Sequence, residues 1–356
     1  MAKLLFGACA NESADVGLIR KTGIDWVRQD LAMPFADRVG GRLTDEYLRN
    51  RALVQSWIGQ GLKVMGVTPR PFGGSYEPDE QGVLRLRVKR CLPEWCGAPG
   101  SEAYNRSYEE ICAWLAQDLK GLISTWQIAN ELDIELFAGP LTARQACEFI
   151  AHGARGLKRT DASSVVGHNP AGCGPHSDYF YGWFYGGRGA LLDYCGVDGY
   201  YGTWIDGGPE SWDRRLAELR ELTGVPILVN EWGFSSEGAQ LAPGELPADR
   251  TPCQVRKWPS TWGPGHTPEG QAAFVRECFD VFLKHRRSLL GVFFYRWEDQ
   301  QNCWQCGRAD CPMETRWGLV DLDGKPKPAW TAYKEGLAAM KAAEEAASTK
   351  GLSQGK

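Results

Sequence analysis

The chain has 356 residues with a formal net charge of −4, and 43% of the residues are hydrophobic. That length is common for α/β barrels and allows one large domain or two of medium size. The mild acidity excludes the basic footprint of a nucleic-acid-binding protein, and no segment approaches the ~18 apolar residues of a membrane span. We therefore expect no nucleic-acid or membrane partner, and the sequence favours no particular oligomeric state. A cytoplasmic location is expected, or secretion if a leader peptide is removed.

Short apolar segments alternate with amphipathic ones along the whole chain. The apolar segments are mostly bounded by Gly, Asp or Pro, which is typical of buried parallel strands. The stretches between them repeat apolar residues with the 3.6-residue period of helices. Two of these helices are predicted to begin with capping boxes, at Ser107 with Glu110 and at Thr142 with Gln145. The eight predicted strands cover residues 4–10, 25–31, 62–70, 124–131, 163–169, 194–201, 227–232 and 292–298.

This alternation predicts a single (β/α)8 barrel, the TIM barrel of the α/β class. The barrel is expected to cover residues 1–348, and residues 349–356 are expected to form a disordered tail. A doubly wound open sheet is the competing fold, but no Gly-x-Gly-x-x-Gly motif follows an early strand. Long loops follow predicted strands 3, 7 and 8, which places them on the face where barrels carry their active sites. These loops cover residues 71–106, 234–268 and 299–325.

Two of the predicted strands lead into an asparagine followed by a glutamate. Asn130 and Glu131 close the fourth strand, and Asn230 and Glu231 lie near the end of the seventh. An ionised group at a buried strand end costs free energy unless it is hydrogen-bonded or used. The carboxyl ends of all barrel strands open on one mouth, so the two glutamates are expected to face each other. Hydrolysis of a glycosidic bond needs two carboxyl groups of this kind, one as acid and one at the anomeric carbon.

The same segments resemble a known family. Residues 126–131 and 227–233 are similar to the strand-4 and strand-7 signatures of the clan A retaining glycoside hydrolases, and the likeness extends to residues 294–298 and 318–328. The resemblance implies a retaining β-glycosidase that cleaves an oligo- or polysaccharide by double displacement. It makes Glu131 the acid/base and Glu231 the nucleophile, with a carbohydrate as partner and no cofactor for catalysis.

The resemblance also implies roles for neighbours of this pair. Asn130 would donate a hydrogen bond to the sugar 2-hydroxyl, and Arg28 matches the arginine that supports the nucleophile. Arg28 in a plain ion pair at the barrel mouth remains an equal alternative. Tyr200 or Tyr201 would hydrogen-bond the nucleophile, and only one can do so because adjacent strand residues point to opposite faces.

Further pocket residues are expected at the ends of strands 5 and 8. Trp297 would floor the sugar site, although it could also simply pack in the barrel, and Glu298 is expected beside it. His168 and Asn169 are expected to line the pocket, with a buried core histidine as the alternative for His168. Most aromatic residues of the long loops are expected to anchor those loops, and one or two to support a sugar ring. These loop residues are Phe72, Tyr76, Trp95, Trp258, Trp262, Trp304 and Trp317.

Two other classes of function remain open. Asp198, Glu231 and Glu298 end strands 6, 7 and 8 and could chelate Mg²⁺ in a metal-dependent barrel enzyme. That alternative leaves Glu131 without a role and provides no lysine base at a strand end. A barrel that binds sugar without cleaving it is the third possibility, and the presence of both glutamates argues against it.

Four cysteines of the loops after strands 7 and 8 are candidates for a metal site. Cys303, Cys306 and Cys311 crowd three thiols into one loop, and Cys253 in the neighbouring loop supplies a fourth. Four thiolates make a structural zinc site. Disulfides in an exported protein, or reduced thiols inside a cell, are the alternatives.

Overall fold

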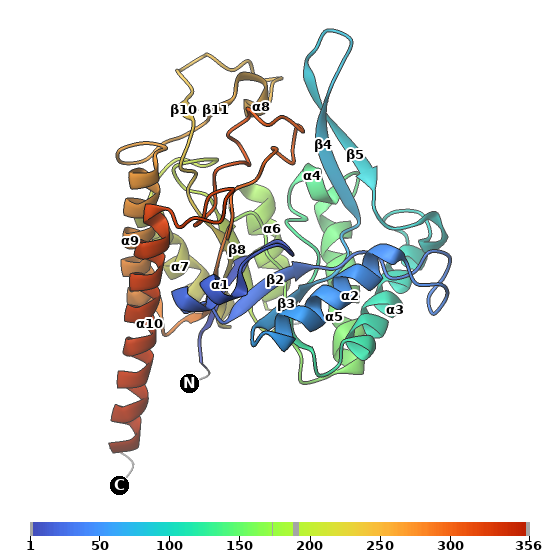
Figure 1. The fold of residues 1–356 in the computed structure, drawn as a ribbon. Helices are drawn as coiled ribbons and strands as arrows, with labels where there is room; N and C mark the ends of the chain where they lie inside the picture. The colour runs from blue at the N-terminus through green and yellow to red at the C-terminus, as the bar shows by residue number, and fades with distance from the viewer. Residues whose placement is uncertain (1–2, 173, 188–191, 354–356) are drawn as a thin grey trace.

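The computed structural model describes residues 3–172, 174–187 and 192–353. Eight parallel strands form a nearly closed barrel, and helices surround it (Figure 1). All eight predicted strands are present, in the order β7-β6-β3-β2-β1-β12-β9-β8. The protein is therefore an α/β TIM barrel, as the alternation of elements predicts. The strands are β1 Leu5–Cys9, β2 Trp26–Asp30, β3 Lys63–Val67, β6 Ile123–Gln127, β7 Val165–Gly167, β8 Cys195–Gly199, β9 Ile227–Trp232 and β12 Leu289–Phe294.

The barrel closes between β7 and β8 through single hydrogen bonds rather than a ladder. The backbone N–H of Asp193 donates to the carbonyl of Val166 at 2.7 Å, and that of Asp198 donates to the carbonyl of Pro170 at 3.0 Å. The Asp193 carboxylate also accepts from the Val166 N–H at 2.8 Å. These contacts bring β7 and β8 together, so the side chains at the ends of all eight barrel strands share one mouth.

The outer helices pack around the barrel (Figure 1). No described helix is both long and apolar enough to span a membrane. The capping box at Thr142 and Gln145 is confirmed at the start of α5. The box predicted at Ser107 is wrong, because α3 already begins at Glu102 and its cap is Ser101, whose hydroxyl accepts from the Tyr104 N–H. The outer helices are α1 Val16–Thr22, α2 Asp45–Gly59, α3 Glu102–Asp118, α5 Ala143–Thr160, α6 Pro175–Tyr185, α7 Pro209–Thr223, α9 Pro268–His285 and α10 Pro328–Ser353.

The last helix is longer than expected. Residues 349–353, which we expected in a disordered tail, continue α10, while residues 354–356 lie outside the described residues. The preceding Ala-, Glu- and Lys-rich sequence has high intrinsic helix propensity, which accounts for the extension. The helix packs along α9, and its end projects beyond the barrel (Figure 1).

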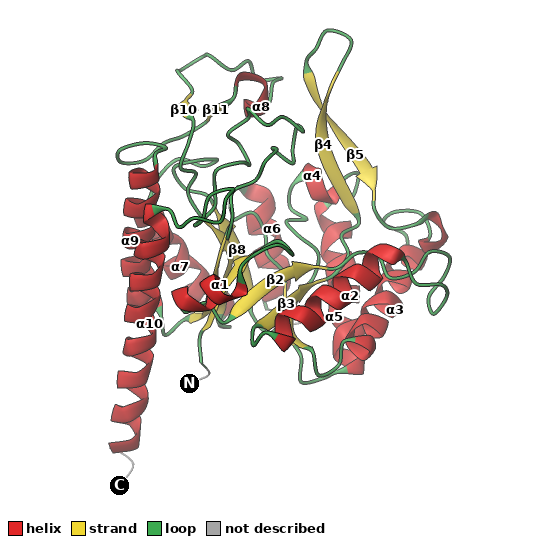
Figure 2. Cartoon of the chain, viewed as in Figure 1, coloured by secondary structure: helices red, strands yellow, loops and turns green. Residues whose placement is uncertain are grey.

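Two of the three long loops carry small elements of their own at one end of the barrel (Figure 2). The loop after β3 forms the antiparallel hairpin of β4 (Phe72–Pro78) and β5 (Leu84–Arg90), followed by the 3-10 turn η1 (Glu94–Cys96). The loop after β9 contains β10 (Ala239–Gln240), α8 (Pro252–Val255) and β11 (Lys257–Trp258), and a short helix α4 (Glu135–Ala138) follows β6.

A second apolar cluster, separate from the main barrel core, lies among these loops. We call it the loop core. It joins the hairpin to the loops after β9 and β12, so these segments pack on one another over the barrel mouth. Its buried members are Leu84, Cys253, Trp258, Cys303, Cys311, Met313 and Trp317.

Candidate active site

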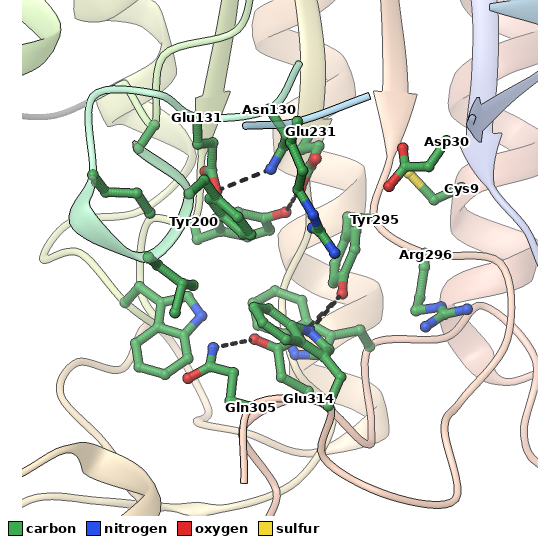
Figure 3. Close-up of a pocket in the computed structure, with 18 of the residues that line it drawn as sticks. Cys9, Asp30, Asn130, Glu131, Tyr200, Glu231, Tyr295, Arg296, Gln305 and Glu314 are labelled. Carbon is green, nitrogen blue, oxygen red and sulfur yellow. Dashed lines mark hydrogen bonds between the residues drawn. The ribbon is translucent and has the colours of Figure 1, made fainter. Parts of the chain in front are cut away.

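A cavity of about 780 Å³ opens at the carboxyl ends of the barrel strands (Figure 3). Five of the predicted site residues line it: Arg28, Asn130, Glu131, Tyr200 and Glu231. The two glutamates reach this cavity from β9 and from the loop after β6. The structure therefore brings the predicted carboxylate pair into one compartment, which is what shared chemistry requires.

A bulge in β9 aims the Glu231 side chain. The register with β8 steps from Val197 opposite Val229 to Asp198 opposite Glu231, and the register with β12 shifts at the same place. One extra residue in a strand re-aims the side chains beside it. Asn230 and Glu231 consequently both reach polar partners inside the barrel, although neighbouring residues of a regular strand would point to opposite faces.

The carboxylate of Glu231 is almost completely buried and is held by two side chains. Its Oε1 lies 2.9 Å from Nη2 of Arg28, and its Oε2 accepts a hydrogen bond from the hydroxyl of Tyr200. Tyr201 instead packs edge-on against Trp212, with ring centroids 5.3 Å apart. Of the two candidate tyrosines, Tyr200 is the one that contacts the predicted nucleophile.

Gln127, to which the sequence assigned no role, connects these groups. Its Oε1 accepts from Nε of Arg28 at 2.9 Å and from Nδ2 of Asn230 at 2.8 Å. Its Nε2 donates to the Ala129 carbonyl at 2.7 Å and to Oδ1 of Asn130 at 3.2 Å. This fully buried amide uses both ends, and it fixes the arginine between β6 and β9. The only sequence signal for this role of Gln127 was its position three residues before Asn130.

Glu131 lies on a backbone with unusual torsion angles. Ala129 and Glu131 have φ values of +50° and +43°, in the left-handed region that non-glycine residues rarely adopt. The Glu131 N–H donates to the Asn169 carbonyl at 3.2 Å, and Nδ2 of Asn130 lies 3.4 Å from Oε2 of Glu131. Such conformations persist where surrounding contacts hold them, often at functional sites. Here they turn the chain so that Glu131 lines the cavity.

The two glutamates have different electrostatic surroundings. Burial raises the pKa of Glu131 well above its ordinary value, and the nearby negative charge of Glu231 raises it further. Burial also raises the pKa of Glu231, but the Arg28 guanidinium and the Tyr200 hydroxyl oppose that rise. Among the described residues, a cation directly contacts Glu231 but not Glu131. Glu131 is therefore the group expected to keep a proton when one of the pair ionises.

Asn169 and His168 lie behind the cavity wall rather than in it. Asn169 is fully buried, and its Nδ2 donates to Oδ1 of Asn130 at 2.8 Å and to Oδ2 of Asp198 at 2.6 Å. His168 bonds the Ile128 carbonyl through Nδ1 at 2.7 Å and stacks on Phe180. Burial lowers the pKa of His168 to about 4, so its ring is neutral at physiological pH. The structure thus places His168 in the core, which was the alternative interpretation.

Trp297 and Glu298 also lie outside the cavity lining. Trp297 is buried in the main core, and its backbone N–H donates to the carbonyl of Cys9 at 2.8 Å. Glu298 accepts from the N–H of Asn11 at 2.7 Å. Tyr295 lines the cavity from the same strand end. We expected Trp297 to form the floor of the sugar site. The chain direction after β12 instead turns Trp297 into the core, and Tyr295 lines the cavity.

The carboxylates proposed for Mg²⁺ do not meet. Asp198 is fully buried against Asn169 and Glu298 bonds Asn11, while Glu231 faces the cavity. Within the described part of the chain, the four-cysteine cluster is the group found to converge closely enough for a metal. The magnesium alternative therefore has no ligand set in this part of the chain.

Residues of the loop after β12 complete the cavity, and sequence reasoning did not single out two of them. Glu314 is buried, and its carboxyl accepts from Nε2 of Gln305 at 2.7 Å and from the Tyr295 hydroxyl at 3.2 Å. Trp304 lies at the rim, 40% exposed, with Nε1 3.2 Å from the same hydroxyl. Glu314 and Gln305 stand in irregular loop sequence, where no periodic pattern marks a site; Trp304 was one of the expected loop aromatics.

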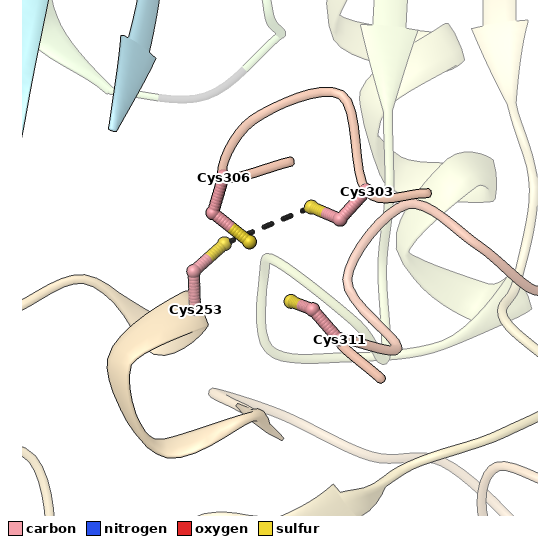
Figure 4. Close-up of side chains that lie close together, drawn as sticks. All are labelled: Cys253, Cys303, Cys306 and Cys311. Atoms are coloured by element: carbon pink, nitrogen blue, oxygen red, sulfur yellow. Dashed lines mark hydrogen bonds between the residues drawn. The ribbon is translucent and has the colours of Figure 1, made fainter. Parts of the chain in front are cut away.

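The four predicted cysteines converge beside this wall (Figure 4). The sulfur atoms of Cys253, Cys303, Cys306 and Cys311 all lie within 4.8 Å of one another, and those of Cys253 and Cys303 are 4.0 Å apart. A tetrahedral zinc ion with Zn–S bonds of ~2.3 Å would place its sulfur ligands roughly 3.8 Å apart. The cluster therefore fits a four-thiolate zinc ion with little rearrangement.

Comparisons with known proteins support the fold. No family model and no curated protein matches the sequence. Among solved structures, the exo-β-1,4-mannosidase Op5Man5 from Opitutaceae bacterium strain TAV5 matches with a TM-score of 0.65 and 14% identity, over 96% of this chain and 60% of that one. The glucosidase from Croceicoccus marinus matches with a TM-score of 0.61 and 14% identity, over 95% and 68% of the two chains.

A third similar structure is the GH2 β-galacturonidase from Eisenbergiella tayi. Its TM-score is 0.57 and its identity 18%, over 95% of this chain and 51% of that one, so this chain spans about half its length. At these identities the likeness establishes the barrel fold alone. All three neighbours are glycosidases.

The Glu314 carboxyl predicts a pH-dependent contribution to stability. Burial raises its pKa from the ordinary 4.5 to about 8. Between pH 4.5 and about 8, the folded protein keeps the Glu314 proton while the unfolded chain releases it. The free energy of unfolding therefore falls as pH rises through this range. In Glu314→Gln the loss should be absent, so the free energy of unfolding of the wild type should fall relative to the variant with rising pH. Urea unfolding at a series of pH values measures this. Parallel profiles would contradict the prediction, and Glu335→Gln, on the exposed face of α10, serves as control.

Proposed function

We propose that this protein is a retaining glycoside hydrolase that cleaves β-glycosidic bonds of an oligo- or polysaccharide. One observation carries the proposal: Glu131 and Glu231 line the same cavity, and of the two, Glu231 alone has a cation and a tyrosine hydroxyl from the described part of the chain in contact with its carboxylate. Glycosidic cleavage uses such a pair, with one carboxyl protonated and the other ionised.

In the proposed mechanism, the Glu231 carboxylate attacks the anomeric carbon while the bond to the leaving oxygen breaks. Glu131 gives its proton to that oxygen, and a glycosyl ester on Glu231 results. Glu131, now ionised, then takes a proton from water, and the water oxygen displaces Glu231 from the sugar. The second displacement restores both carboxyl groups and gives a product with the anomeric configuration of the substrate.

Neighbouring side chains support these steps. Arg28 compensates the charge of Glu231 before attack, and the Tyr200 hydroxyl orients its second oxygen. Asn130 accepts bonds from Arg28 and Asn169 through Oδ1, which leaves its Nδ2 directed toward Glu131 and able to meet the sugar 2-hydroxyl. A bond to this hydroxyl strengthens in the transition state.

The similar structures agree with this class of substrate. Their names describe enzymes acting on mannosides, glucosides and galacturonides. We propose a carbohydrate with β-linked sugars as the partner of this chain, without a cofactor for catalysis. A sugar-binding barrel without catalysis is the weaker alternative, because binding alone needs no pair of carboxyls in different protonation states.

We also propose that Cys253, Cys303, Cys306 and Cys311 bind a structural zinc ion. Support comes from the convergence of their sulfur atoms and from the loop core around them, which joins loops with little regular secondary structure. An ion bound by four thiolates cross-links such loops.

Replacing the nucleophile should abolish turnover. In Glu231→Ala the hydrolysis of an aryl β-glycoside should fall by at least about 10³-fold, because no group remains to form the glycosyl ester. Azide should enter the vacated space, partly restore turnover and give a glycosyl azide of inverted configuration. Product analysis by NMR checks this. Glu335→Ala is the matched control, and full activity of Glu231→Ala would end the assignment.

The zinc proposal predicts about one zinc ion per chain in protein purified without added metal. Elemental analysis should find it in the wild type and find it strongly reduced in Cys306→Ser, which removes one of four ligands. Cys91→Ser is the control, since Cys91 is exposed and far from the cluster in sequence. Wild-type protein without bound metal would refute the proposal.

A further inference from the structure

The turn between Cys303 and Cys306 forms part of the wall of the candidate active site. The two residues between these cysteines, Trp304 and Gln305, both line the cavity. The turn is tight: the Gly307 N–H donates to the Cys303 carbonyl at 2.7 Å, and the Cys303 N–H donates to the Arg308 carbonyl at 2.9 Å. Cysteine sulfurs therefore flank the very residues that a substrate would touch.

Gln305 is held by three different loops. Its Nε2 donates to Oε1 of Glu314 at 2.7 Å, and its backbone carbonyl accepts from the Tyr76 N–H of the β4–β5 hairpin at 2.6 Å. Its Oε1 lies 3.8 Å from the sulfur of Cys253 in the loop after β9. The amide position thus depends on how the loops after β3, β9 and β12 are joined.

Trp304 offers an aromatic surface at the cavity rim. It is 40% exposed, and its ring lies nearly parallel to that of Phe137, with centroids 6.1 Å apart. Phe137 belongs to α4, and both rings line the cavity. Exposed tryptophan rings beside carboxyl and amide groups suit sugars, because the ring covers the apolar face and the polar groups bond the hydroxyls.

We propose that Trp304, Gln305 and Glu314 form a second sugar-binding position, whose geometry is set by the metal ion at the four cysteines. This inference rests on the proposed glycosidase function and narrows its substrate to chains of at least two sugar units. One ring lies between Glu131 and Glu231. The next lies on Trp304, with its hydroxyls toward the Gln305 amide and the Glu314 carboxyl.

The metal is expected to fix the geometry of the second sugar-binding position, because the loop core around it is small. The core joins three long loops, and the cysteines supply three of its seven buried members. Bound zinc fixes Cys303 and Cys306 relative to Cys253, and so fixes the turn that carries Trp304 and Gln305. The catalytic glutamates are held mainly by Arg28 and Gln127 in the barrel. Tyr200, which also contacts Glu231, packs on Trp317 of the loop core with ring centroids 5.0 Å apart. Loss of the metal should therefore disturb the second position much more than the first.

A comparison of two substrates separates these positions. A β-glycosyl fluoride fills only the position at the glutamates, whereas a β-linked disaccharide of the same sugar also reaches Trp304. In Cys306→Ser and in Trp304→Ala, KM for the disaccharide should rise by about tenfold, which is the scale of a lost aromatic contact. In Cys306→Ser, both KM and kcat for the fluoride should stay within about twofold. Cys91→Ser should change neither, and equal losses on both substrates, or none, would overturn the proposal.

A measurement without turnover keeps the test independent of the catalytic assignment. Calorimetry with cellobiose and β-1,4-mannobiose on Glu231→Gln should detect binding of at least one, weakened about tenfold by Trp304→Ala or by removal of the metal. Trp304→Ala keeps all four thiols, so it remains informative if a cysteine variant fails to fold. The second position is refuted if Trp304→Ala or removal of the metal leaves the disaccharide affinity unchanged. It is also refuted if Glu231→Gln binds neither disaccharide. Turnover by Glu231→Ala refutes the proposed function separately.

Discussion

The ion pair between Arg28 and Glu231 is the interaction on which the rest of the site depends. A carboxylate inside a barrel is stable only when a cation and hydrogen bonds compensate its charge, and removing one partner of such a pair typically costs ~3–5 kcal/mol. Arg28 reaches Glu231 at 2.9 Å and is itself oriented by Gln127, so strands β2, β6 and β9 meet in one polar network. Within residues 3–172, 174–187 and 192–353, no cation contacts Glu131. This difference favours the protonated form of Glu131 over that of Glu231, which is the basis of the roles we propose for them.

The polar network and the loops form different parts of the cavity. The barrel holds the two glutamates in place, since Gln127, Asn169 and Asn130 are buried and bonded to one another or to Arg28. The loops after β3, β9 and β12 supply the outer wall and pack on a core of their own. Catalytic groups on a rigid scaffold with variable loops around them are the general arrangement of TIM-barrel enzymes.

The sequence predicted the barrel well because buried parallel strands and amphipathic helices leave periodic patterns. It also placed the two glutamates, since an Asn-Glu pair at a strand end is a local signal. It could not predict side-chain direction beyond the strands, so Trp297 was expected in a wall that Tyr295 forms. The bulge that aims Glu231 inward has no sequence signature, and Glu314 comes from an irregular loop that only tertiary packing brings to the cavity.

The central claim is that Glu231 attacks the sugar while Glu131 holds the proton. Trapping the covalent intermediate tests it most directly. A panel of activated 2-deoxy-2-fluoro β-glycosides should inactivate the enzyme with time, because the fluorine slows hydrolysis of the ester more than its formation when the leaving group is good. Mass spectrometry of the digested protein should find one sugar attached to the peptide containing Glu231. Attachment to another residue, or turnover of the natural linkage with inverted configuration and no adduct, would contradict the mechanism.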